Sequence, residues 1–153
     1  MSNELRLLLI EDDHLQAQGI QAGLRDQLAR DYPSVAFDVV PTESEFYSRF
    51  EQIASAGFAA AIVDVMLRWA DPSPQMPEPP TEVLEGGFFR AGLRCRGKLA
   101  TDPRTSSLPV VIYTVLEESR LPAGIDIVVK STDLSPLADR IRRQLAQRKS
   151  VQP

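Results

Sequence analysis

Acidic residues follow two short apolar runs of this chain. Residues 7–10 (Leu-Leu-Leu-Ile) lead directly into the acidic residues 11–13, and residues 59–63 (Ala-Ala-Ala-Ile-Val) lead directly into Asp64. Short, bounded apolar runs are typical of strands buried on both faces of a parallel sheet. Ligand sites of such sheets lie beyond the carboxyl ends of the strands, so the pattern predicts one acidic pocket at one sheet edge. Carboxylates crowded in this way favour a hard divalent cation such as Mg²⁺.

Two further predicted strands end in groups that complement these acids. Residues 109–114 (Pro-Val-Val-Ile-Tyr-Thr) end in Thr114, and residues 125–129 lead into Lys130. A hydroxyl, an ammonium and three carboxylates at one edge suit phosphoryl transfer to a carboxylate. One carboxylate attacks phosphorus to form an acyl phosphate, and Mg²⁺ held by the other two neutralises the developing charge. The lysine supplies a fixed positive charge, and the threonine donates a hydrogen bond to a phosphoryl oxygen.

Strands and helices alternate along the chain, which predicts an α/β fold with a doubly wound, five-stranded parallel sheet. No internal repeat and no second domain is evident. A capping box, Thr42-x-x-Glu45, predicts the start of one helix. The other expected helices cover about 15–31, 83–100 and 133–147, and the expected strands cover 6–10, 35–40, 58–65, 109–114 and 125–129.

Composition narrows the class of protein. The chain has 153 residues, is 43% hydrophobic and 25% charged, and carries a formal net charge of -4, which is typical of one globular domain and gives no sign of nucleic-acid binding. The single cysteine, Cys95, cannot form an internal disulfide and fits a reducing compartment. No run is long enough to span a membrane, and no signal peptide is evident. We therefore expect a cytoplasmic protein without membrane or nucleic-acid partners.

Four stretches carry a family resemblance. They are residues 7–13 (Leu-Leu-Leu-Ile-Glu-Asp-Asp), 62–67 (Ile-Val-Asp-Val-Met-Leu), 102–114 (Asp-Pro-Arg-Thr-Ser-Ser-Leu-Pro-Val-Val-Ile-Tyr-Thr) and 128–130 (Val-Val-Lys). In this order, each at the end of a predicted strand, they resemble the receiver domain of two-component response regulators. The resemblance covers nearly the whole chain and implies a flavodoxin-like sheet with strand order 2-1-3-4-5.

The resemblance implies a role for each acid at the sheet edge. By analogy with the family, Asp64 is the phosphoacceptor and also a ligand of Mg²⁺. Asp12 is expected to bind the ion directly, and Glu11 through a water molecule. The backbone carbonyl of Met66 is the remaining expected ligand.

The same resemblance assigns the other two polar groups and the partners. Thr114 is expected to be the switch hydroxyl, and Lys130 the lysine that pairs with the phosphoryl group. The phosphoryl donor is expected to be a histidine on a separate histidine kinase or phosphotransfer protein, and the signal is expected to pass to an unknown protein effector. The domain would not be an enzyme beyond its own phosphorylation and dephosphorylation.

A proline-rich insertion of about residues 68–85 departs from the family, which usually crosses from the third strand to its helix by a short turn. It holds five prolines and the only tryptophan, Trp69, and begins a few residues after Asp64. Such composition favours extended backbone. A mobile surface loop, a lid over the acyl phosphate and a docking segment for a partner are the alternatives. Deletion of residues 72–80 is expected to change the acyl-phosphate lifetime or partner binding.

Two more departures concern the segment that signals phosphorylation in the family. Residues 115–124 are too few for the usual helix of about three turns, and Pro122 interrupts them. The sequence therefore predicts a shortened or missing fourth helix and no use of the usual dimer face. Ile127 stands where the family commonly has a rotating aromatic residue, and Tyr113 is expected to point to the side of its strand opposite to Thr114.

The remaining expectations concern the chain ends and the loop after the lysine. The receiver domain is expected over residues 1–149, with a polar tail over 150–153 and no output domain. Ser131 follows Lys130 where the family usually has proline after a cis bond; a cis bond before serine costs about 3 kcal/mol.

Two other functions remain open from the sequence. One is a receiver-like binding module that works without phosphorylation, which the departures favour. The other, more remote, is a Mg²⁺-dependent phosphohydrolase or nucleic-acid-processing enzyme that uses the acidic pocket.

Overall fold

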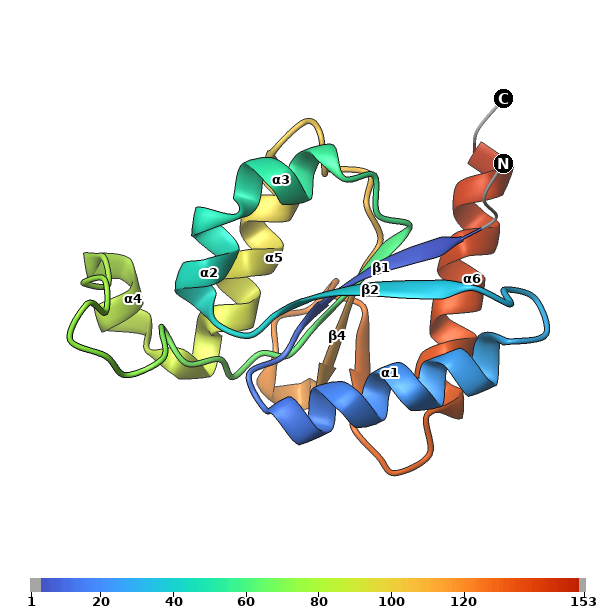
Figure 1. The fold of residues 1–153 in the computed structure, drawn as a ribbon, viewed down its shortest axis with the longest axis horizontal. Helices are drawn as coiled ribbons and strands as arrows, with labels where there is room; N and C mark the ends of the chain where they lie inside the picture. Colours follow the sequence, from blue (N-terminus) through green and yellow to red (C-terminus); the bar gives the residue numbers. More distant parts are fainter. Residues whose placement is uncertain (1–3, 152–153) are drawn as a thin grey trace.

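The sheet has the predicted topology. The computed structural model describes the backbone of residues 4–151 and the side chains of residues 4–148. Five parallel strands pair in the order β2-β1-β3-β4-β5, which confirms the doubly wound α/β fold (Figure 1). Each strand bound lies within about two residues of its expected position. The strands are β1 (Leu5–Ile10), β2 (Val35–Val40), β3 (Ala60–Val63), β4 (Val110–Thr114) and β5 (Ile127–Val129).

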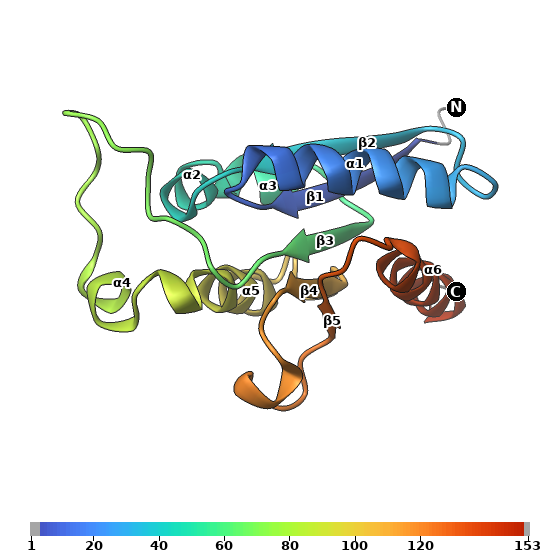
Figure 2. The same cartoon turned by 90° about the horizontal axis from the view of Figure 1, so that it is seen from below.

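Helices cover both faces of this sheet (Figures 1 and 2). Helices α1 (His14–Leu28) and α6 (Ser135–Val151) lie on one face, and α2 (Glu43–Ser48), α3 (Phe50–Ser55) and α5 (Ala91–Thr101) lie on the other. Alternate residues of the central strands face opposite cores, as the two-residue period of a strand requires. Leu7 and Leu9 of β1 therefore join the α1–α6 core, while Leu8 and Ile10 join the other.

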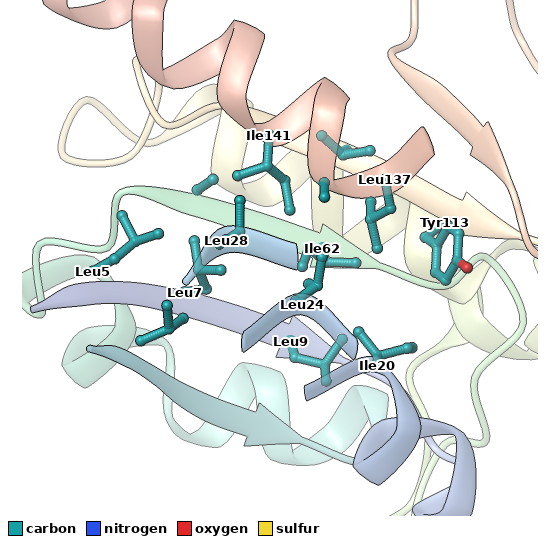
Figure 3. Packing of buried hydrophobic residues seen from close by; sticks show 14 of the residues in the cluster. Leu5, Leu7, Leu9, Ile20, Leu24, Leu28, Ile62, Tyr113, Leu137 and Ile141 are labelled. Atoms are coloured by element: carbon teal, nitrogen blue, oxygen red, sulfur yellow. The ribbon is translucent and has the colours of Figure 1, made fainter. Parts of the chain in front are cut away.

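The α1–α6 core follows the sequence pattern closely (Figure 3). Ile20, Leu24 and Leu28 form the predicted apolar stripe of α1, and all three are buried. Leu137 and Ile141 of α6 pack against the same face. Truncating a buried leucine of this kind to alanine usually costs about 2–5 kcal/mol, so this packing holds α1 firmly beside the sheet edge.

Three expected helices need correction. The helix expected over 83–100 is divided into α4 (Thr81–Gly86), a 3₁₀ turn η1 (Phe88–Arg90) and α5, because Gly87 adopts a positive φ of 70° that ends α4. The helix that Thr42 caps is divided into α2 and α3 at Arg49. The last helix, expected over 133–147, begins at Ser135 and continues to Val151. The division into a receiver domain over 1–149 and a polar tail over 150–153 stays a prediction. Residues 152–153 lie outside the described residues.

The shortened fourth helix is confirmed. Only a 3₁₀ turn, η2 (Glu118–Arg120), lies between β4 and β5. The Lys130–Ser131 peptide bond is trans. Within residues 4–151, none of the helices has the length and apolarity that a membrane span requires.

The insertion leaves the body of the molecule after β3. No helix or strand forms between Val63 and Thr81. Figures 1 and 2 both show this loop and α4 projecting outward beyond α2 and α5. The beginning of the loop is attached to α2, because the N–H groups of Glu43 and Ser44 donate to the carbonyls of Arg68 and Trp69 at 3.1 and 2.8 Å. These carbonyls satisfy donors that the first turn of a helix leaves free.

Candidate functional site

The parallel register brings the predicted site residues to one edge of the sheet. Ile10 lies opposite Val63, and Thr114 lies opposite Val129. The residues that follow these positions, Glu11, Asp64 and Lys130, therefore emerge beside Thr114 at the carboxyl ends of β1, β3 and β5, with Thr114 closing β4. Backbone hydrogen bonds hold this edge, from Asp64 N to Ile10 O at 3.0 Å and from Lys130 N to Thr114 O at 2.8 Å.

Lys130 is the centre of the site. Its Nζ donates to Glu11 Oε2 at 2.7 Å and to Asp64 Oδ2 at 2.8 Å. The third proton of the ammonium goes to Gln16 Oε1 at 2.5 Å, so all three donors are used. The side chains of Lys130, Glu11 and Asp64 are 11%, 1% and 7% exposed, so the cluster is largely shielded from water. Sequence reasoning missed Gln16, because no local pattern connects the first turn of α1 with a residue 114 positions away.

Burial changes the electrostatics of this cluster. Desolvation, together with the negative charge of Asp64, raises the pKa of Glu11 to about 7, although the hydrogen bond from Lys130 opposes the shift. Burial by itself lowers the pKa of Lys130, but hydrogen bonds to Asp64 and Glu11 outweigh it, and the pKa of the ammonium is raised. The structure thus keeps a charged lysine against two crowded carboxyl groups.

Asp12 has a different partner. Its Oδ2 accepts a hydrogen bond from the backbone N–H of Arg68 at 3.0 Å, and Arg68 Nε lies 3.7 Å away. Arg68 is the first residue of the insertion, so the insertion begins with a contact to a predicted metal ligand. This pairing was not anticipated from the sequence, since the two residues are 56 positions apart.

The loop after Asp64 is held by the start of α5. Met66 N donates weakly to Asp64 Oδ1 at 3.4 Å, and Gly92 N donates to Val65 O at 2.8 Å. Gly92 lies so close that a Cβ on it would be 1.8 Å from the Asp64 carbonyl oxygen. The role of the Met66 carbonyl as a metal ligand stays a prediction.

Thr114 and Tyr113 lie on opposite sides of β4, as predicted. Thr114 is fully buried, and its Oγ1 accepts from Leu116 N at 3.4 Å. Tyr113 belongs to the α1–α6 core (Figure 3), and its hydroxyl donates to Ser131 O at 3.2 Å. Tyr113 therefore supports the loop that follows Lys130, and it lies away from the threonine hydroxyl.

The donor atoms suit Mg²⁺ in type, although their present partners are the chain's own cations. Carboxylate and carbonyl oxygens are the ligands that this ion prefers. Among the residues that the structure describes, no three His, Cys, Asp or Glu side chains are grouped so that they could hold a metal. The ion pairs are consistent with this, because Lys130 pairs with Glu11 and Asp64, and Arg68 pairs with Asp12. Arg68 therefore competes for Oδ2 of Asp12 with any ion at this edge.

Comparison with solved structures identifies the architecture. The bacteriophytochrome response regulator AtBRR superposes with a TM-score of 0.60 at 15% identity, over 93% of this chain and 92% of that one. A response regulator receiver domain from Rhodospirillum rubrum gives 0.57 at 18% identity, over 97% and 96%. The chain has the fold of a response regulator receiver domain. The Mn²⁺-bound form of response regulator Rcp1 shares this receiver fold, with a TM-score of 0.57 at 15% identity over 91% and 90% of the two chains.

Comparisons of the amino-acid sequence itself found no match. No protein-family model matches the chain, and no curated protein matches its sequence.

Proposed function

We propose that this chain is a phosphoacceptor receiver, in which Asp64 takes a phosphoryl group from a phosphohistidine of a histidine kinase or phosphotransfer protein. The observation that supports this most is the placement of Lys130, whose ammonium lies within hydrogen-bond distance of both Asp64 and Glu11. A fixed cation beside a buried carboxylate at the strand ends is the arrangement that stabilises a phosphoryl group there. The signal then passes to a protein effector by contact.

In the proposed step a carboxylate oxygen of Asp64 attacks phosphorus. An O–P bond forms as the P–N bond of the donor phosphohistidine breaks, and the electron pair leaves with the imidazole nitrogen, which then binds a proton. Lys130 exchanges its hydrogen bond with Asp64 for one with a phosphoryl oxygen, and the Thr114 hydroxyl donates to another. When bound, Mg²⁺ neutralises the charge on the phosphoryl oxygens.

The expected ligands of that ion are Asp12, Asp64, the Met66 carbonyl and, through water, Glu11. The Mn²⁺-bound form of response regulator Rcp1, which shares this fold, supports the binding of a divalent ion. Release of Asp12 from Arg68 is a step that this chain adds, because the insertion places a guanidinium on the first metal ligand.

A groove beside Lys130 supports access by a donor protein. It has a volume of about 530 Å³ and is lined by Ile20, Val115 and Leu134 together with Lys130 itself. Asp64 does not line this groove, so the groove suits contact with a donor protein beside the acceptor carboxylate.

The test is incorporation of phosphate measured by intact mass. Purified protein is incubated with a small-molecule phosphodonor and Mg²⁺, and the variants Asp64→Asn and Asp139→Asn are treated in the same way. Asp139 is a suitable control because its side chain is 63% exposed and lies on α6. We expect one Mg²⁺-dependent adduct in the wild type and in Asp139→Asn, and none in Asp64→Asn. An adduct that persists in Asp64→Asn contradicts the proposed acceptor.

A receiver-like binding module that works without phosphorylation is the second candidate. The observation that favours it is that each of the three site acids has a cationic partner within the chain, Lys130 for Glu11 and Asp64 and Arg68 for Asp12, which reduces the need for a metal in the folded site. If folded protein forms no adduct with any donor, and a panel of histidine kinases also fails, this second function replaces the first.

A further inference from the structure

Exposed apolar side chains occur along the insertion and where it rejoins the fold before α5. Met76, Leu84, Phe88 and Phe89 are 44%, 69%, 52% and 58% exposed, and the other large exposed apolar residues within the described side chains are Leu15, Val115 and Val129. Phe88 and Phe89 stack on each other with ring centroids 4.1 Å apart. Aromatic groups gathered at one place on a surface mark interaction sites more often than scattered apolar residues do. We call Leu84, Phe88 and Phe89 the aromatic patch.

The backbone beneath the aromatic patch is firmly held. Phe88 O accepts from Leu67 N at 3.2 Å, and Gly87 O accepts from Arg94 Nη2 at 2.9 Å. The same guanidinium makes two further hydrogen bonds, at 2.8 and 2.7 Å, to the fully buried carboxylate of Glu43. The patch is therefore presented on a braced support, and a preorganised surface loses less entropy when a partner binds.

The insertion beside the aromatic patch is acidic, although the exposed Arg90 directly follows Phe89 in η1. Residues 71–89 contain Asp71, Glu78, Glu82 and Glu85 and no lysine, arginine or histidine. The three glutamates are exposed, and none of them has an ion-pair or hydrogen-bond partner among the described side chains. Unpaired carboxylates beside exposed aromatic rings complement a surface that is both apolar and basic.

We propose that the aromatic patch and its glutamates bind an amphipathic, positively charged helix of a partner protein. Such a helix places its apolar side chains against Leu84, Phe88 and Phe89, and its lysines or arginines against the glutamates, as helices do when they dock on apolar surfaces. Anionic membranes and nucleic acids do not fit, because their negative charge is repelled by this segment.

A second copy of this chain lacks the complementary surface. Its α6 is the helix with most basic residues, and there Arg140 pairs with Asp126 and Arg148 donates to the carbonyls of Phe58 and Ala59 at 3.1 Å each. The large apolar side chains of α6 that the structure describes, Leu137, Ile141 and Leu145, are buried in the core. The partner helix must therefore come from another protein.

The position of the aromatic patch also connects it with Asp64. Leu67, which donates to Phe88 O, lies three residues after Asp64, and the start of α5 hydrogen-bonds to Val65. A change at the phosphoacceptor loop is therefore transmitted to the support of the patch. This connection rests on the proposed function, whereas helix binding does not, so binding is measured without a phosphodonor.

The probe is a fluorescent helical peptide built only of leucine and lysine in an amphipathic order, about four turns long. Anisotropy titrations compare it with a leucine–glutamate peptide of the same pattern and with a shuffled leucine–lysine peptide. We expect the wild type to bind the amphipathic leucine–lysine peptide more tightly than it binds either of these two control peptides. The double variant Phe88→Ser/Phe89→Ser is expected to weaken binding by about tenfold or more, as loss of central aromatic contacts does. Glu82→Gln/Glu85→Gln is expected to weaken it several-fold and to reduce its dependence on salt.

Matched variants elsewhere on the surface separate this site from general attraction to an acidic protein. Leu15→Ser removes an apolar side chain that is more exposed than either phenylalanine, and Glu117→Gln/Glu118→Gln removes two exposed charges outside the insertion. Both are expected to bind like the wild type. Equal binding by Phe88→Ser/Phe89→Ser and the wild type overturns the proposal. Sedimentation of the protein alone provides a second test. If the wild type forms a dimer and Phe88→Ser/Phe89→Ser does not, the proposal is also overturned, because a second copy would then occupy the patch.

Discussion

Gly92 leaves no room for a side chain beside the backbone of the loop that follows β3. A Cβ on this residue would lie 1.8 Å from the carbonyl oxygen of Asp64, 2.7 Å from its carbonyl carbon and 2.8 Å from the Cα of Val65. These are main-chain atoms, which cannot turn aside as a flexible side chain can. In Gly92→Ala the start of α5 and the loop must therefore move apart.

The expected loss of stability in Gly92→Ala follows from three contributions. Overpacking of a closely fitted site costs about 1–3 kcal/mol. Strain or loss of the hydrogen bond from Gly92 N to Val65 O, 2.8 Å long, costs about 1 kcal/mol more. The higher helix propensity of alanine offsets about 0.5–1 kcal/mol. The net loss is about 1–3 kcal/mol, which lowers Tm by roughly 3–10 °C for a domain of this size.

Urea denaturation followed by circular dichroism measures this loss, and Gly97→Ala is the matched control. Gly97 lies in the same helix, but no atom stands within 4 Å of the position of its Cβ. Gly97→Ala gains helix propensity without a clash, so we expect it to be about 0.5–1 kcal/mol more stable than the wild type. The two alanine variants should therefore differ by about 2–4 kcal/mol.

Equal stability of the two alanine variants refutes the close approach of α5 to Asp64. The mass assay gives a second readout, because a displaced Asp64 should accept phosphate more slowly in Gly92→Ala than in Gly97→Ala. Unchanged incorporation in a destabilised Gly92→Ala would show that the contact supports the fold without positioning the acceptor.

Three further predictions concern the charges of the site. Lys130→Met leaves Glu11 and Asp64 together without their shared cation, so we expect the free energy of unfolding, measured by urea denaturation, to fall by about 3 kcal/mol. Added Mg²⁺ should restore part of this stability. No recovery with the ion argues against a metal at this edge. Arg68→Ala removes the guanidinium beside Asp12 but keeps the backbone N–H hydrogen bond to its Oδ2. Because an exposed ion pair contributes about 1 kcal/mol or less, Mg²⁺ should bind up to about fivefold more tightly by calorimetry; equal affinity means that the guanidinium does not compete with the ion. Burial raises the pKa of Glu11 in the folded state from 4.5 to about 7. In metal-free buffer, the free energy of unfolding that Glu11 contributes relative to Glu11→Gln should therefore be complete below pH 4.5 and disappear as the pH rises through about 7. Identical pH profiles of the two proteins contradict the raised pKa.

Local patterns explain the elements that could be predicted. The apolar stripe of α1 and the cap at Thr42 depend on spacing within one or two turns, and both lie where the sequence places them. The helix over 83–100 was predicted as one piece because its apolar spacing continues through Gly87. A glycine is compatible with a helix and equally with a positive φ, and the packing of η1 beneath the loop selects the latter.

Pairings between distant side chains were beyond such reasoning. Gln16 on Lys130 and Arg68 on Asp12 join residues 114 and 56 positions apart. Several cations and acids of the chain could have formed these pairs with equal chemistry, and a local pattern does not choose among them. Solvent exclusion and the geometry of the packed elements make that choice.

The sequence by itself determined which groups meet at the edge of the sheet. Apolar runs that end in Glu11, Asp64 and Lys130 place these groups at the same edge of a parallel sheet, and the strand order β2-β1-β3-β4-β5 puts β1 beside β3 so that they meet. Only the tertiary structure decided how those groups are paired and what surrounds them. The close approach of Gly92 to Asp64, the contact of Arg68 with Asp12 and the exposure of Phe88 each depend on where the insertion leaves and rejoins the fold, which is a property of the packed chain as a whole.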